Sequence, residues 1–97
     1  MLARVTTMGF KVDKIDEGIA IYKRSVIPAA KSQRGYRGAF LLADRQAGKA
    51  VSITFWKEEA DAVANEENRY YQEQLVKFIE ILTSPPIKES YEVSVYD

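Results

Sequence analysis

Hydrophobic and polar positions in the first third of the chain follow the period of a strand and then that of a helix. Residues 2–10 are rich in Val, Thr, Met and Phe and end in a Gly-Phe pair, which predicts a strand. Apolar residues then recur every three or four positions over residues 14–32, which predicts an amphipathic helix with Asp13 as its N-cap. Pro28 removes one backbone hydrogen bond near the end of this helix, so we expect its last turns to be bent or loosened.

The middle of the chain predicts a β-hairpin. Residues 39–43 form one apolar run, and residues 50–56 alternate between two faces, so both segments are predicted strands. Residues 44–49 join them as a hairpin loop, with Gly48 at a position that favours positive φ.

The last third predicts a second helix and a final strand. The helix begins in the acidic segment 58–61, and the polar segment 65–68 holds weak helix formers that we expect to bend or split it. Its predicted apolar positions are Ala60, Val63, Tyr70, Tyr71, Leu75, Phe78, Ile79 and Leu82. Pro85 and Pro86 cannot continue a helix, and residues 91–96 are the predicted last strand.

The predicted order β-α-β-β-α-β is that of the ferredoxin-like fold, an α+β architecture with a four-stranded antiparallel sheet. We expect one domain over residues 1–97, with both helices on one face of the sheet. Right-handed crossovers lead us to expect the first and third strands side by side and parallel at the centre.

The sheet face that two helices leave uncovered is predicted to be apolar. In an isolated domain this face is mainly polar. Here one set of alternate residues in the third strand is Val51, Ile53 and Phe55, and the other set includes Trp56. An exposed apolar face of a few hundred Å² exceeds what monomers usually carry. We therefore expect a homodimer that packs sheet face against sheet face, as a dimeric α+β barrel.

Composition narrows the chemistry. Fourteen Lys and Arg balance fourteen Asp and Glu, so no net charge attracts nucleic acid or an anionic membrane. The chain has no cysteine and no histidine, which removes the thiolate nucleophile, the commonest general base and the commonest metal ligands. We expect no metal and no cofactor. With no run of about 20 apolar residues and no signal peptide before the first strand, we also expect a cytoplasmic protein without membrane contact.

One face of the third predicted strand carries candidate ligand-binding residues. Ser52, Thr54 and Trp56 share this face, so all three can line one pocket. The indole supplies flat apolar area and an N–H donor, while the hydroxyls can orient a phenol or a small acid. In the alternative interpretation, Trp56 fills the core and the two hydroxyls are satisfied beneath a helix.

Arg4 is a cation near the middle of a predicted central strand. It must be paired or reach a water-filled cavity, so it either binds an anionic group of a ligand or pairs with Asp44 or a helix carboxylate. Four tyrosines are predicted either to line an aromatic pocket or to fill the core: Tyr22, Tyr36, Tyr70 and Tyr71. The adjacent carboxylates Glu66 and Glu67 are interpreted as solvated helix charges.

The run from Gly35 to Trp56 (GYRGAFLLADRQAGKAVSITFW) and the segment 57–61 resemble the antibiotic-biosynthesis-monooxygenase domain family of dimeric α+β barrels. Residues 3–7 and 26–28, with the closing Pro85-Pro86 and Tyr91-Glu92-Val93, fit it too, so the resemblance spans nearly the whole chain. It implies a dimeric barrel. Cofactor-free members oxidise bulky phenolic polyketides between the sheet and the helices, which implies a site at the strand tryptophan.

Two further positions follow from this resemblance. The cofactor-free branch has a polar amide four residues before the tryptophan, where this chain has Ser52, and an arginine on the second helix, for which Arg69 is the candidate. Haem-degrading members bind iron through a histidine on that helix. This chain has no histidine, so haem binding by that route is excluded.

Together these features predict a small protein that binds a small aromatic or otherwise apolar molecule. If it is catalytic, the expected reaction is cofactor-independent oxygenation of a phenolic compound. A non-catalytic ligand-binding or structural homodimer is the alternative, and an ACT-like regulatory module is a third possibility. The RNA-recognition motif shares the strand order, but residues 49–56 lack its glycine and first aromatics, so we expect no nucleic-acid partner.

Overall fold

The computed structural model describes all 97 residues. Its strands are β1 (Leu2–Gly9), β2 (Tyr36–Asp44), β3 (Lys49–Trp56) and β4 (Ile87–Glu92). Its α-helices are α1 (Ile15–Ile21), α2 (Ile27–Lys31), α3 (Glu59–Glu67) and α4 (Arg69–Val76). Two 3₁₀ turns lie at Val12–Lys14 and Ile79–Ile81, and a π-helical turn at Tyr22–Val26 joins α1 to α2. The order of strands and helical runs is the predicted ferredoxin-like one.

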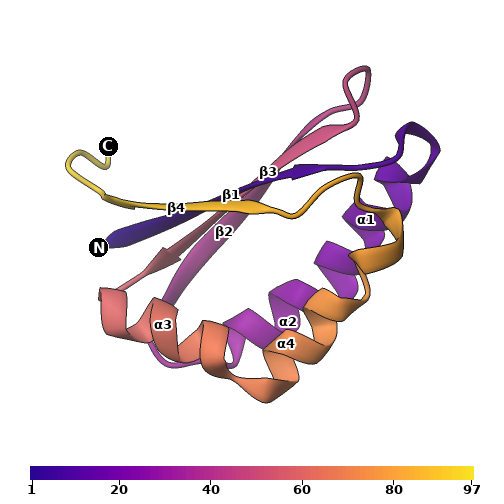
Figure 1. Cartoon of the computed structure of the whole chain (residues 1–97). Coiled ribbons are helices and arrows are strands. Elements are labelled where there is room, and N and C mark those ends of the chain that lie inside the picture. The colour runs from indigo at the N-terminus through magenta and orange to yellow at the C-terminus, as the bar shows by residue number, and fades with distance from the viewer.

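The four strands form one antiparallel sheet in the order β2-β3-β1-β4, and the helices lie together on one side of it (Figure 1). β3 is antiparallel to both of its neighbours, β1 and β2. The prediction that the first and third strands are parallel is therefore wrong. The helical crossover makes β1 parallel to β2, and β3 is inserted between them in the opposite direction.

The first helical run changes type along its length. Asp13 is not its N-cap: it lies inside the first 3₁₀ turn, which the extended residue Lys11 precedes without a side-chain cap. In the π-helical turn the N–H of Ile27 bonds the carbonyl of Tyr22, five residues back. Pro28 follows with no N–H to donate, so the wider turn accommodates it. The loosening predicted from Pro28 is confirmed.

The second helix is split in two at Asn68, within the segment predicted to bend or split it. Asn68 has an extended backbone (φ −68°, ψ 123°), and its side-chain oxygen accepts a hydrogen bond from the Tyr71 backbone N–H at 3.0 Å. An asparagine in this role caps the helix that follows it. The break therefore sets the direction and phase of α4 independently of α3.

The last strand lies earlier than predicted, at Ile87–Glu92 instead of residues 91–96. Its only neighbour is β1, and Glu92 is already opposite Leu2 at the start of that strand. Residues beyond Val93, whose N–H bonds the Met1 carbonyl, have no strand to pair with. The alternating pattern of the chain end therefore predicted the last strand too late, because a strand also needs a neighbour to pair with.

The two faces of the sheet carry different side chains. On the helix side, Met8, Ala50 and Trp56 are buried in two core clusters with the helices. On the other side, Phe40 and Leu42 are 59% and 52% exposed, and the Phe40 ring meets Phe55 edge to face with centroids 6.0 Å apart. The uncovered apolar face predicted from the strand pattern is therefore present. None of the helices combines the length and the apolar character needed to cross a membrane.

Candidate functional site

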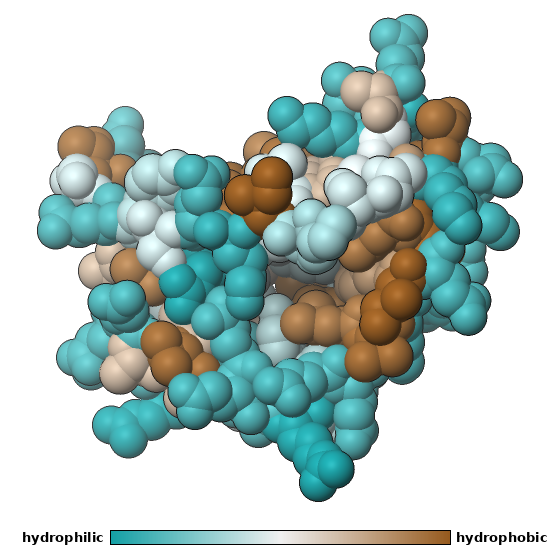
Figure 2. Space-filling model, viewed as in Figure 1, coloured by the Kyte–Doolittle hydropathy of each residue, from teal (hydrophilic) through white to brown (hydrophobic).

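A cavity of about 290 Å³ lies between the sheet and the helices. Figure 2 shows its mouth as a hollow with hydrophobic residues on one side and hydrophilic residues on the other. The apolar part of the wall includes Met8, Val26, Leu75, Phe78 and Leu82. The cavity is therefore open to solvent and amphipathic, as small-molecule sites commonly are.

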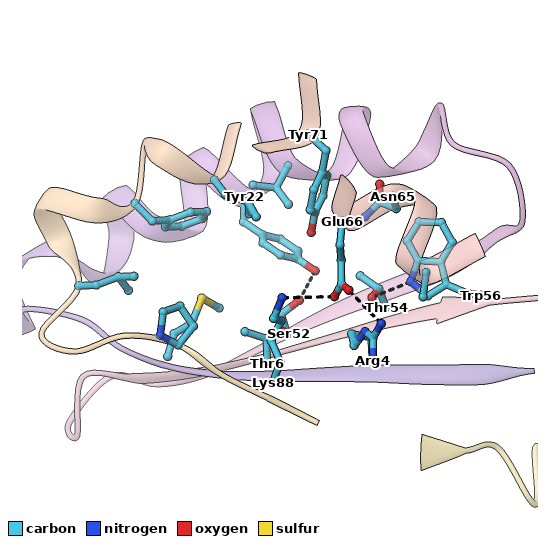
Figure 3. Close-up of a pocket in the computed structure, with 17 residues that line it drawn as sticks. Arg4, Thr6, Tyr22, Ser52, Thr54, Trp56, Asn65, Glu66, Tyr71 and Lys88 are labelled. Carbon is cyan, nitrogen blue, oxygen red and sulfur yellow. Dashed lines mark hydrogen bonds and ion pairs between the residues drawn. The ribbon is translucent and has the colours of Figure 1, made fainter. Parts of the chain in front are cut away.

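The sheet side of the cavity is built by alternate residues of the two central strands. Successive side chains of a strand point to opposite faces, so every second residue faces the helices. The register places Arg4 opposite Thr54 and Thr6 opposite Ser52. All four line the cavity (Figure 3). Three of the residues predicted from sequence, Arg4, Ser52 and Thr54, are thus brought together on one surface.

A hydroxyl pair spans the cavity from sheet to helix. The Tyr22 and Ser52 oxygens are 2.7 Å apart and buried, and either can donate (Figure 3). Tyr22 opens the π-helical turn, from which its side chain points down to the sheet. Burial raises the pKa of Tyr22 to about 12, more than its hydrogen bond to Ser52 lowers it. Tyr22 is therefore a neutral phenol with a proton to donate at any physiological pH.

Trp56 is both a core residue and a wall of the cavity. It is 1% exposed and packs with Ala30 and Ala62, and the Tyr36 ring meets it edge to face with centroids 5.8 Å apart. Its indole N–H donates to Thr54 Oγ1 at 3.0 Å. The two interpretations of the sequence are therefore compatible, because one side of a large buried ring fills the core while another borders the cavity.

Three charged residues meet at one end of the cavity. Arg4 donates to Glu66 Oε1 at 2.9 Å and also to Ser90 Oγ, and Lys88 Nζ lies 3.6 Å from Glu66 Oε2. The Arg4 and Glu66 side chains are 17% and 26% exposed. The prediction that Arg4 pairs with a helix carboxylate is confirmed, and the carboxylate is on α3 rather than Asp44. Interpreting Glu66 as solvated was wrong, because it turns inward to meet the two cations.

Asn65 and Tyr71 complete the helix side of the cavity. Burial raises the pKa of the Tyr71 phenol, the Asn65 side chain acts in the opposite direction, and the Glu66 charge adds to the rise. Asn65 is 2% exposed, and its Oδ1 has no hydrogen-bond partner. The Nε of Arg4 is likewise buried without a partner. Both unpaired atoms belong to residues of the cavity wall.

Two residues predicted for the site lie elsewhere. Arg69 and Tyr70 are exposed and do not line the cavity. The break at Asn68 starts α4 in a phase that turns Tyr71 inward and Tyr70 to solvent, since successive helix residues point about 100° apart. Of these two neighbouring tyrosines, Tyr71 is therefore the one that lines the cavity.

Asn65, Glu66 and Lys88 were missed as site residues. The apolar pattern predicted Ala60 and Val63 as the inner face of the helix, yet both are exposed and α3 turns Ala62 and Asn65 inward. A helix whose inner face lines a polar cavity has no apolar stripe on that face. The spacing of its apolar residues therefore points to the wrong face as the buried one. The signal available was the spacing of three and four that puts Asn65 and Glu66 on the face of Ala62. No three His, Cys, Asp or Glu side chains gather as a metal site.

Sequence comparison gives a partial match only. No protein-family model matches the chain. Over 49 residues it is 43% identical to the uncharacterized proteins Rv2557 and MT2634 of Mycobacterium tuberculosis. This stretch covers 50% of the chain but only 22% of the length of each relative.

Solved structures match the whole fold. A protein from Bordetella bronchiseptica and one from Nitrosomonas europaea, both named as antibiotic biosynthesis monooxygenases, superpose with TM-scores of 0.84 and 0.80 at 15% identity. The alignments cover 94% and 93% of this chain, and 94% and 86% of those chains. SnoaB of Streptomyces nogalater, described as a cofactor-independent oxygenase, matches at TM-score 0.78 and 11% identity over 98% of this chain and 94% of its own. The chain therefore has the fold of the antibiotic biosynthesis monooxygenases, as its resemblance to that family predicted.

Proposed function

We propose that this protein binds a small aromatic molecule in the cavity between its sheet and its helices. The observation that carries the proposal is the cavity itself, which joins an apolar wall around Phe78 to the paired hydroxyls of Tyr22 and Ser52. Its volume of about 290 Å³ is about twice the ~150 Å³ that holds a benzene ring in an engineered cavity. One substituted ring, or a fused pair of rings such as that of 1-naphthol, therefore fits inside the wall.

Trp56 provides the test, because it is the only tryptophan of the chain and borders the cavity. We expect phenol and 1-naphthol to change its fluorescence in a saturable way, and calorimetry to give the same dissociation constant. Cyclohexylamine, a cation without a ring π-system, is the control ligand. Failure of both ring compounds to bind in both measurements would contradict the proposal.

Cofactor-independent oxygenation of the bound molecule is the catalytic form of this proposal. It is supported by the fold shared with proteins named as monooxygenases and by the cavity's hydrogen-bond donors. In such a reaction 1-naphthol and O₂ give 1,4-naphthoquinone and water, so the substrate supplies the electrons and one oxygen atom leaves as water. The protein would hold the substrate, keep solvent from the intermediate and offer the neutral Tyr22 phenol as a proton donor.

Oxygen uptake separates the enzyme from a non-catalytic binder. We expect the protein to accelerate oxygen consumption by 1-naphthol, and Trp56→Phe to reduce that rate while the protein stays folded. Binding of 1-naphthol without any uptake would instead support the alternative, a ligand-binding homodimer. The rate of oxygen consumption in a sample that binds 1-naphthol therefore distinguishes an enzyme from a non-catalytic binder.

Homodimer formation is the second part of the proposal. Its support is the apolar outer face of the sheet, where Phe40, Leu42, Ile87 and Tyr91 are each more than half exposed. Covering such a face removes apolar surface from water, at about 25 cal/mol per Å² before the costs of association. We expect sedimentation velocity at micromolar concentration to give a dimer. A single species with the mass of one chain would overturn this part.

A further inference from the structure

The charged end of the cavity holds more hydrogen-bond donors than acceptors. Arginine has five N–H donors and lysine three, whereas the two oxygens of a carboxylate accept about four hydrogen bonds. Here Arg4 uses two of its nitrogens, on Ser90 and Glu66, and its Nε has no partner. Lys88 has only the 3.6 Å contact to Glu66. Donors on both cations therefore remain free for another acceptor.

The same end carries a net positive charge. Arg4, Glu66 and Lys88 are the charged residues of the cavity wall, two cations and one anion, which leaves one positive charge. Arg4 is largely withdrawn from solvent, while Lys88 is 57% exposed at the rim. A charge in such a partly closed cavity interacts more strongly than it would on an open surface. One further negative charge, supplied by a ligand, would neutralise this excess positive charge.

The apolar wall lies beside this charged end. Figure 3 shows Arg4 and Lys88 on the sheet side and Glu66 reaching down to them from the helix side. Leu75, Phe78 and Leu82 line the remainder of the same space. A ring placed against these residues therefore directs a substituent towards the two cations.

We propose that the ligand class of this cavity is a single-ring aromatic monocarboxylate, whose carboxylate is held by Arg4 and Lys88 and whose affinity is limited by Glu66. This inference rests on the proposed binding of a small aromatic molecule. It adds the charge and the size of the ligand: one ring with one carboxylate fits about 290 Å³, and one negative charge matches the excess positive charge. Glu66 competes with the ligand for the same donors, so it weakens binding while it keeps the empty site paired.

Three ligands of nearly equal size test the charge. Benzoate, benzyl alcohol and benzylamine have the same ring with a negative, a neutral and a positive substituent at pH 7.5. We expect benzoate to bind at least tenfold more tightly than benzyl alcohol in calorimetry, and benzylamine to bind most weakly. Equal affinity for benzoate and benzyl alcohol would overturn this inference but leave the proposed function standing. Absence of binding by all three, and by phenol and 1-naphthol, would overturn both.

Two variants test the residues, and they are expected to act in opposite directions. Lys88→Met removes a cation at the rim and should weaken benzoate several-fold with little effect on benzyl alcohol. Glu66→Gln removes the competing carboxylate and should tighten benzoate several-fold. Lys31→Met, an exposed lysine away from the cavity, is the matched control and should change neither. A merely structural role for Glu66 predicts weaker binding of every ligand, so that result would contradict the inference.

Glu66→Gln also leaves Arg4 without its carboxylate, so we expect the variant to be less stable than the wild type. Its thermal midpoint is then the second measurement. Because a ligand that binds only the folded state raises this midpoint, benzoate should raise it by more in Glu66→Gln than in the wild type. An equal or smaller rise would count against the inference, whatever the stability of the free variant.

Discussion

The two faces of the sheet reverse the usual distribution of polar and apolar residues. Arg4, Ser52 and Thr54 lie beneath the helices, whereas Phe40 and Leu42 face solvent. A polar group under a helix costs free energy unless it is paired, and here the hydroxyls and the guanidinium pair along a cavity wall. An apolar outer face also costs free energy in a monomer. The comparison therefore supports both proposals, a ligand against the inner face and a second sheet against the outer face.

Trp56 and Phe55 are neighbours on opposite faces and give the sharpest form of this comparison. Trp56→Ala should lower the free energy of unfolding by about 3–5 kcal/mol, because it empties a fully buried site between strand and helices. Urea unfolding followed by circular dichroism measures this loss. Phe55→Ala, on the outer face, is the matched control and should cost clearly less when unfolding is followed at a protein concentration at which the chain is monomeric. Equal losses at the two positions would show that the faces do not differ.

The outer face can be broken without touching the inner one. The double substitution Phe40→Lys and Leu42→Lys places two charges on each chain's outer face, where a second sheet would cover them. We expect the dimer dissociation constant to rise at least 100-fold, about 2.7 kcal/mol. Sedimentation equilibrium measures it. Ile79→Lys, at an apolar residue exposed elsewhere, should leave the dimer intact, and an unchanged dimer in the double variant would exclude this face as the interface.

The sequence predicted the outer face better than the inner one, for a physical reason. Strand alternation has a period of two, so Val51, Ile53 and Phe55 could be assigned to one face without any knowledge of the helices. The split of the second helix followed from a similar local signal, the weak helix formers before Arg69. Local signals carry no information about a partner strand, which is why the last strand was placed too late.

The inner site was predicted well on the strands, and on the helices only for Tyr22 and Tyr71, whereas the polar residues of α3 were missed. Arg4, Ser52, Thr54 and Trp56 were identified because a strand places alternate residues on one face. Glu66 was missed because its role depends on the rotation of α3 about its axis, which Ala62 fixes by packing against Trp56. That contact joins distant parts of the chain, and hydrophobic periodicity does not report it.

The hydroxyl pair of Tyr22 and Ser52 tests whether the polar groups of the inner face satisfy one another's hydrogen bonds. Tyr22→Phe or Ser52→Ala alone leaves one buried hydroxyl without its partner, and each should cost about 1–2 kcal/mol of unfolding free energy. The double variant should cost less than the sum of the two, since no hydroxyl is then left unpaired. Urea unfolding of all four proteins completes the cycle. Additive costs would mean that the two oxygens do not interact.

The burial of Tyr22 also predicts a smaller effect, a loss of stability at alkaline pH. Burial raises the pKa of Tyr22 from 10.0 to about 12, so the folded protein keeps the phenol proton that the unfolded chain releases. The unfolded state therefore binds fewer protons above pH 10, and the free energy of unfolding falls as the pH rises from about 10 to 12. Between pH 9 and pH 11 this amounts to about 1 kcal/mol. Urea unfolding across this range should show a smaller decrease for Tyr22→Phe than for the wild type. Because burial also raises the pKa of Tyr71, part of the decrease should persist in the variant. If the variant and the wild type lose the same free energy, Tyr22 is not held as a buried neutral phenol. Water would then reach the inner face of the sheet at this position.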